Sequence, residues 1–119
     1  MIKRSASYGG ILHEVVEHGD TLYLSGLVAE DLAGGIEAQA EDIMRQLETL
    51  LSAHGSDMRH VLQAIVYLSD LGQKGSFNAV WKRRFAADVL PARAAIGVAD
   101  LGPGVLVEMV VTAAKKRPA

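Results

Sequence analysis

Cysteine is absent from this 119-residue sequence, and proline and aromatic residues are scarce. Without cysteine the chain has no disulfide framework, no thiolate nucleophile and no cysteine-ligated metal, which suits the reducing cytoplasm. Its apolar runs stay far below the roughly twenty residues that a membrane-spanning helix needs. The start, Met1–Tyr8, also lacks the apolar stretch of a signal peptide. We therefore expect a soluble, cytoplasmic protein with no membrane partner.

An excess of positive charge is lacking as well. Twelve Lys and Arg residues stand against fourteen Asp and Glu residues, which gives a net charge of −2 and a pI near 6.0. This balance argues against a nucleic-acid-binding surface, so no nucleic-acid partner is expected. The histidines lack the spacing of a zinc site, and the sequence has no GxSxG, GxxxxGK[ST] or GxGxxG motif. We expect neither a metal site nor a cofactor.

Half of the residues are hydrophobic, enough for one core, so residues 1–119 are expected to form a single domain. Apolar and β-branched segments predict strands at 11–17, 21–28, 61–68, 93–99 and 105–114. The first two are expected to form a hairpin around Gly19-Asp20. Gly26, inside the second strand, indicates either a bulge or a close approach of the backbone to a ligand.

Two segments have helical periodicity. Apolar residues at three- and four-residue steps predict a helix from Ile36 to Leu51, and Gly55 would end it. The charged residues of this helix are interpreted as a solvated face. A second helix is predicted over 75–89, before Pro91, with Trp81 as a core anchor rather than a ligand platform.

This element order predicts an α+β fold, a sheet with two helices packed on one face. Two helices cover a single face of a sheet, yet the strands are apolar on both sides. The other face therefore needs a partner, and self-association is the simplest source of one. Such an assembly would create pockets between subunits.

Two charged residues interrupt segments that otherwise have the pattern of buried strands. Arg93 begins a strand after Pro91-Ala92, and Glu108 lies inside Val105–Val111. A charge in such a place is paired, solvated or used. Either the two side chains face solvent at a sheet edge or pair across adjacent strands, or Arg93 binds a carboxylate while Glu108 handles a water molecule.

The segments 91–101 (PARAAIGVADL) and 105–109 (VLVEM) resemble the signature of the reactive intermediate deaminase (RidA/YjgF) family. Weaker matches extend from about Ile11 to Ala114, including Leu24-Ser25-Gly26 and Gln39. The resemblance implies a chorismate-mutase-like fold, a homotrimer and a cleft at each subunit interface. It implies an enzyme, a hydrolase that deaminates 2-imino and enamine acids such as 2-aminoacrylate to 2-keto acids and ammonia, without a cofactor.

Residue by residue, the resemblance implies that Arg93 holds the substrate carboxylate and that Glu108 positions or deprotonates the attacking water. Ser25, Gly26, Asn78 and Ala95 would line the cleft.

The sequence departs from the family pattern at three cleft positions. Leu12 is nearest to the place where many deaminating members carry a tyrosine, and Leu27 stands where a glutamine usually follows the Ser-Gly pair. Ala95 replaces a common cysteine. His13 is a polar candidate for the missing tyrosine or a strand-surface histidine.

Two other functions remain open on these residues. A non-catalytic trimeric sensor of small carboxylates would need Arg93 but not Glu108. A ribonuclease or interaction role would fit some relatives but not the charge balance.

Overall fold

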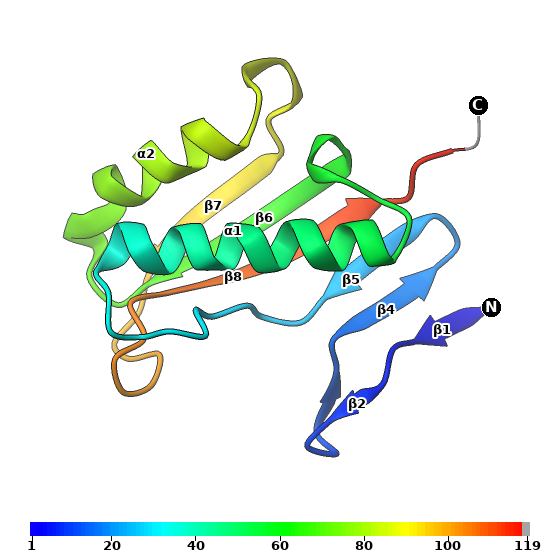
Figure 1. Ribbon diagram of the computed structural model, residues 1–119, viewed down its shortest axis with the longest axis horizontal. Helices are drawn as coiled ribbons and strands as arrows, with labels where there is room; N and C mark the ends of the chain where they lie inside the picture. The colour runs from blue at the N-terminus through cyan, green and yellow to red at the C-terminus, as the bar shows by residue number, and fades with distance from the viewer. Residues whose placement is uncertain (118–119) are drawn as a thin grey trace.

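A computed structural model describes residues 1–117 (Figure 1). The elements in chain order are β1 (Ile2–Arg4), β2 (Ser7–Tyr8), β3 (Leu12–His13), β4 (Val15–His18), β5 (Thr21–Leu24), α1 (Ile36–Ala53), β6 (Val61–Leu68), α2 (Lys74–Arg84), β7 (Ala92–Gly97) and β8 (Val107–Ala114). Short 3₁₀ turns occupy Met58–His60, Leu71–Gln73 and Ala87–Val89. Among these described residues, none of the helices is long and apolar enough to cross a membrane.

Six strands form one mixed sheet in the order β1-β4-β5-β8-β6-β7. Neighbouring strands are antiparallel except β6 and β7, which run parallel. Both helices lie on one face of this sheet (Figure 1), so the predicted α+β architecture is confirmed. The predicted hairpin is confirmed too, because β4 and β5 pair antiparallel. Strands β2 and β3 form a separate two-stranded ribbon.

The core lies between the helices and one face of the sheet. Alternate residues of β8 (Val107, Met109, Val111 and Ala113) are buried beneath the helices, as the two-residue period of a strand requires. The buried residues of α1 are Ile36, Gln39, Ala40, Ile43, Met44, Leu47 and Leu51. The predicted stripe also included Leu50, which is only partly buried, and did not include Gln39. Gly55 follows with φ of 78°, so the predicted left-handed stop is confirmed.

Gln39 is the one polar side chain in this stripe, and its amide joins α1 to the loop before β8. Its Nε2 donates to the carbonyl oxygens of Gly34 (3.2 Å) and Gly104 (2.9 Å). Its Oε1 accepts from the Leu106 N–H at 3.0 Å. A fully buried amide is tolerated because both ends have partners.

The opposite face of the sheet is largely apolar, and no helix within residues 1–117 covers it. Tyr23 and Ile96 lie on this face and are 49% and 42% exposed. Ile65 of β6 and Val110 of β8 are a cross-strand pair, and these two strands lie between β5, which carries Tyr23, and β7, which carries Ile96. The uncovered face expected from the sequence is therefore present in the structure.

Several boundaries differ from the prediction. The strand expected at 21–28 ends at Leu24, and only an isolated bridge from Leu27 to Met109 continues the pairing. The second helix ends at Arg84, because Phe85 turns to an extended backbone (φ −112°, ψ 125°). The strand expected at 11–17 is divided into β3 and β4, which belong to different sheets. Strands β1 and β2 were not predicted, since they are short and exposed and lack an apolar alternation.

Candidate functional site

Arg93 lies on the helix-covered face of the edge strand β7. In the sheet register it stands opposite Ala64 of β6, which stands opposite Val111 of β8, and both of those side chains are buried beneath the helices. The guanidinium carbon lies over the ring of Trp81, 4.8 Å from its centroid, and 5.9 Å from the centroid of Phe77. Both rings belong to α2, so a strand and a helix together hold Arg93.

The Arg93 guanidinium has no anionic partner of its own. Within residues 1–117 it forms no ion pair and no side-chain hydrogen bond, and burial lowers its pKa from the usual range. An arginine nevertheless stays protonated in proteins. Arg93 is thus a half-buried cation whose planar fork is available to bind a carboxylate.

Two other predicted cleft residues belong to the same part of the fold. Ala95 lies two residues after Arg93 on the same strand face and packs against the core. Asn78 follows Phe77 in α2, and its Oδ1 is buried without a hydrogen-bond partner among the described residues. The amide is therefore a second polar group in this region with unused hydrogen-bonding capacity.

Glu108 lies on the other face of the sheet. It stands opposite Tyr67 of β6, which in turn stands opposite Ile96 of β7, and both belong to the uncovered face. Its carboxylate lies directly against Gly26, where a Cβ atom would overlap the Glu108 Oε2. The space at Gly26, which was expected to serve a bulge or a ligand, is therefore occupied by the protein's own carboxylate.

Ser25 is held by the neighbouring chain segment before β4. Its Oγ donates to the His13 carbonyl oxygen at 2.7 Å, and its N–H donates to the Glu14 carbonyl oxygen at 2.9 Å. His13 contacts the Ser5 carbonyl oxygen through Nδ1, so its ring is engaged within the protein.

A pocket of about 560 Å³ adjoins Ser25 and Gly26. Its lining consists of Tyr8, Leu12, Glu14, Ser25, Gly26, Leu27, Val28, Ala29, Glu30 and Gln46. Leu12 and Leu27, the two departures from the family pattern, both lie in this lining. The pocket wall is therefore more apolar than a tyrosine and a glutamine would make it.

The structure thus divides the predicted site residues into two groups. Arg93, Asn78 and Ala95 are held by β7 and α2, while Glu108 lies with Ser25 and Gly26 on the other side of β6. The possibility that Arg93 and Glu108 pair across adjacent strands is wrong, because β6 separates their strands and the two side chains face opposite ways.

Sequence reasoning missed the contact between α2 and Arg93. Trp81 is buried, 6% exposed, as expected of a core anchor, but it is also the residue over which the guanidinium lies. The signal for this was the four-residue spacing of Phe77, Trp81 and Phe85, which places the three rings along one side of the segment.

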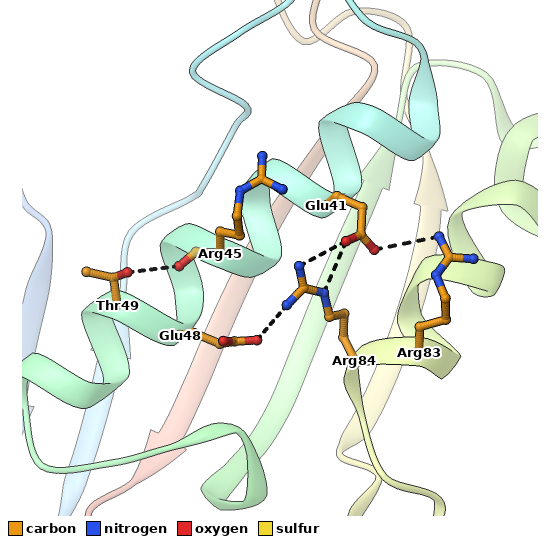
Figure 2. Close-up of polar contacts among 6 residues, drawn as sticks. All are labelled: Glu41, Arg45, Glu48, Thr49, Arg83 and Arg84. Carbon is orange, nitrogen blue, oxygen red and sulfur yellow. Dashed lines mark hydrogen bonds and ion pairs between the residues drawn. The ribbon is translucent and has the colours of Figure 1, made fainter.

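Ion pairs fix α2 against α1 (Figure 2). Arg84 donates from Nε and Nη2 to Glu41 Oε2 at 3.2 and 2.9 Å, and from Nη1 to Glu48 at 2.9 Å. The hydrogen bond from Arg84 holds the pKa of Glu41 below its usual range. Part of the charged face that was interpreted as solvated therefore joins the two helices.

No group of three or more His, Asp and Glu side chains suited to a metal ion occurs within residues 1–117. The arrangement instead offers an unpaired guanidinium, a free carboxylate and a pocket. A guanidinium of this kind is chemically suited to bind a carboxylate.

Comparison with known proteins shows to which protein family the chain belongs. The family model described as Endoribonuclease L-PSP matches residues 2–115, and the chain belongs to this family, the YjgF/RidA family. A member of the YjgF protein family from Neisseria meningitidis has a similar structure, with a TM-score of 0.93 at 32% identity over 99% of this chain and 98% of that one. The chorismate-mutase-like fold implied by the signature is thereby confirmed.

Two curated relatives differ in their names. The mouse 2-iminobutanoate/2-iminopropanoate deaminase is 34% identical over 106 residues, which cover 84% of this chain and 78% of that protein. Protein DfrA of Myxococcus xanthus is 37% identical over 100 residues, which cover 79% of this chain and 76% of its own. The deaminase relatives support imine hydrolysis as the reaction class.

Proposed function

We propose that this protein is a single RidA-like domain (residues 1–119) that hydrolyses reactive 2-imino and enamine acids to 2-keto acids and ammonia. The observation that carries the proposal is Arg93, a half-buried guanidinium that has no ion-pair partner within residues 1–117, in a chain whose relatives include a named imine deaminase. A charge left unpaired in this way is costly unless a ligand uses it.

In the proposed reaction Arg93 binds the substrate carboxylate through two parallel N–H···O bonds. Glu108 orients a water molecule and accepts its proton as the water oxygen adds to C2 of the protonated imine. Glu108 returns this proton to the nitrogen, the C2–N bond breaks and ammonia leaves, and the new hydroxyl group loses its proton as C2 becomes the carbonyl carbon of the keto acid. A protonated imine is already electrophilic, so positioning and charge carry most of the catalysis.

We infer that each site combines two chains. Within one chain Arg93 and Glu108 are separated by β6 and point to opposite faces, so one small substrate does not reach both. Two strand spacings alone amount to about 10 Å. A homotrimer in which the apolar uncovered face is buried would bring Arg93 of one subunit to Glu108 of the next.

The test supplies 2-aminoacrylate from a lyase and follows keto-acid and ammonia release with and without the purified protein. The protein should accelerate both. Arg93→Ala should abolish the effect, and Glu108→Gln should reduce turnover by roughly 10²–10⁴-fold. Unchanged rates with the wild-type protein would overturn the proposal.

Ligand binding separates catalysis from simple sensing. Trp81 is the single tryptophan and contacts Arg93, so its fluorescence should respond when 2-oxobutanoate binds. The response should vanish in Arg93→Ala and persist in Glu108→Gln. Binding of 2-oxobutanoate without any turnover by the wild-type protein would favour a carboxylate sensor, which needs Arg93 but not Glu108.

A further inference from the structure

The aromatic side chains of α2 and its C-cap form a continuous buried row. The Phe77 and Trp81 ring centroids are 6.2 Å apart with an interplanar angle of 46°, and those of Trp81 and Phe85 are 4.4 Å apart at 40°. All three residues are at most 6% exposed. Close packing on both sides fixes the orientation of the central ring, Trp81.

Arg93 lies over this row without a polar contact to it. The guanidinium carbon is 4.8 Å from the Trp81 centroid and 5.9 Å from that of Phe77. The negative face of an aromatic ring attracts a cation, and tryptophan does so most strongly. A guanidinium that lies over a ring face keeps the N–H groups at the edge of its plane free to donate.

Arg84, at the end of the same helix, is held in a different way. Three of its nitrogens donate to Glu41 and Glu48 (Figure 2), so its hydrogen-bonding capacity is used inside the protein. A carboxylate in the same position beside Arg93 would compete with the carboxylate of a ligand. The rings hold the charge of Arg93 in place and leave its donors unoccupied.

We propose that Trp81, assisted by Phe77, is a positioning residue that holds the Arg93 guanidinium ready for the substrate carboxylate. This inference rests on the proposed function, since it assumes that Arg93 binds that group. The rings also exclude water, and an ion pair formed beside them gains strength because the local dielectric is low. Trp81 itself does not touch the reacting atoms.

The test compares three leucine substitutions in the aromatic row. Trp81→Leu should raise the Kd for 2-oxobutanoate and the KM for the imine by about 3- to 30-fold, with kcat changed much less. Phe77→Leu should have a smaller effect, because its ring lies farther from Arg93. Phe85→Leu is the matched control. It removes a buried ring that packs against Trp81 but makes no cation–π contact with Arg93, so it should raise Kd less than Trp81→Leu does.

Calorimetry measures these affinities, since the substitution removes the only tryptophan. Melting temperatures should fall for Phe85→Leu as well as Trp81→Leu, so stability alone does not explain the difference in affinity. Equal losses of affinity in Trp81→Leu and Phe85→Leu would refute the positioning role. Should Trp81→Leu fail to fold, Trp81→Met keeps more of the volume without an aromatic face and carries the same expectation.

A double substitution distinguishes this inference from the proposed function. In an Arg93→Ala background, Trp81→Leu should cause no further loss of residual 2-oxobutanoate binding, because the ring acts through Arg93. A further loss of the same size as in the wild type would overturn the inference. If Arg93→Ala keeps normal binding, Arg93 does not bind the carboxylate and the proposed function is refuted. If Arg93→Ala loses binding while Trp81→Leu keeps it, only the positioning role of Trp81 is refuted.

Discussion

Mixing two inactive variants tests whether one site is shared by two chains. Arg93→Ala removes the proposed carboxylate ligand, and Glu108→Gln removes the proposed proton acceptor, from opposite faces of the same sheet. If each cleft takes Arg93 from one subunit and Glu108 from the next, mixed assemblies contain clefts in which both residues are intact. Neither pure variant contains any.

The expected recovery follows from counting. In an equal, random mixture, half of the subunits supply an intact Arg93, and half of the neighbouring subunits supply an intact Glu108. About a quarter of the clefts are then complete, so about a quarter of wild-type turnover should return. The two variants are co-expressed with different affinity tags and assayed with 2-aminoacrylate. Purified assemblies that carry both tags exclude the pure-variant trimers, so one of their three clefts is complete and about a third of wild-type turnover should return in them.

A second mixture provides the control. Wild-type chains combined equally with the Arg93→Ala/Glu108→Gln double variant should keep about a quarter of the activity if sites are shared, and about half if each chain holds its own site. Mixed assemblies of the two single variants with no activity above that of the pure variants would refute a shared site. A monomeric mass near 12.7 kDa in sedimentation would refute the trimer itself.

Three further outcomes are expected. Gly26→Ala should fold but displace the Glu108 carboxylate, which lowers turnover by about 10²-fold; full turnover would show that the contact is unimportant. Arg84→Ala should lower the free energy of unfolding by about 1–2 kcal/mol. The free energy of unfolding should also depend less on pH in the acid range. The depressed pKa of Glu41 contributes stability that is present above its unfolded value near 4.5 and is lost as the pH falls through the folded pKa. Denaturant melts of both proteins between pH 3 and 6 measure this. Activity should survive exhaustive chelation, since the imine carbon needs no metal to become electrophilic, and loss of turnover restored by one specific metal would contradict this.

The sequence was sufficient to predict the layers of the fold, but not which face of the sheet each charged side chain lies on. Helical and strand periods predicted both helices and the uncovered apolar face. Strands β6 and β8 are apolar along almost their whole length, so their period did not indicate which residues face the helices. The opposite facing of Arg93 and Glu108 follows from the register of both strands with β6, which depends on contacts distant in sequence.

Local conformation set further limits on what the sequence could predict. Phe85 fits the apolar spacing of the second helix, yet it leaves the helix to complete the ring row beneath Trp81. Packing here overrides the helical pattern. Gly26 was expected to mark a bulge or a close approach to a ligand, but the structure places the protein's own Glu108 carboxylate against it.

The buried amide of Gln39 has a consequence for how this chain tolerates change. Together with the hydrogen bond from the Ser69 N–H to the Leu106 carbonyl oxygen, it fixes where the chain re-enters the sheet. The segment 99–103 lies between two fixed points, the hydrogen bond from the Val98 N–H to the Leu68 carbonyl oxygen and the bond from Gln39 to Gly104. Insertions or deletions there should alter a surface loop while β8 keeps its register, and with it the direction in which Glu108 points.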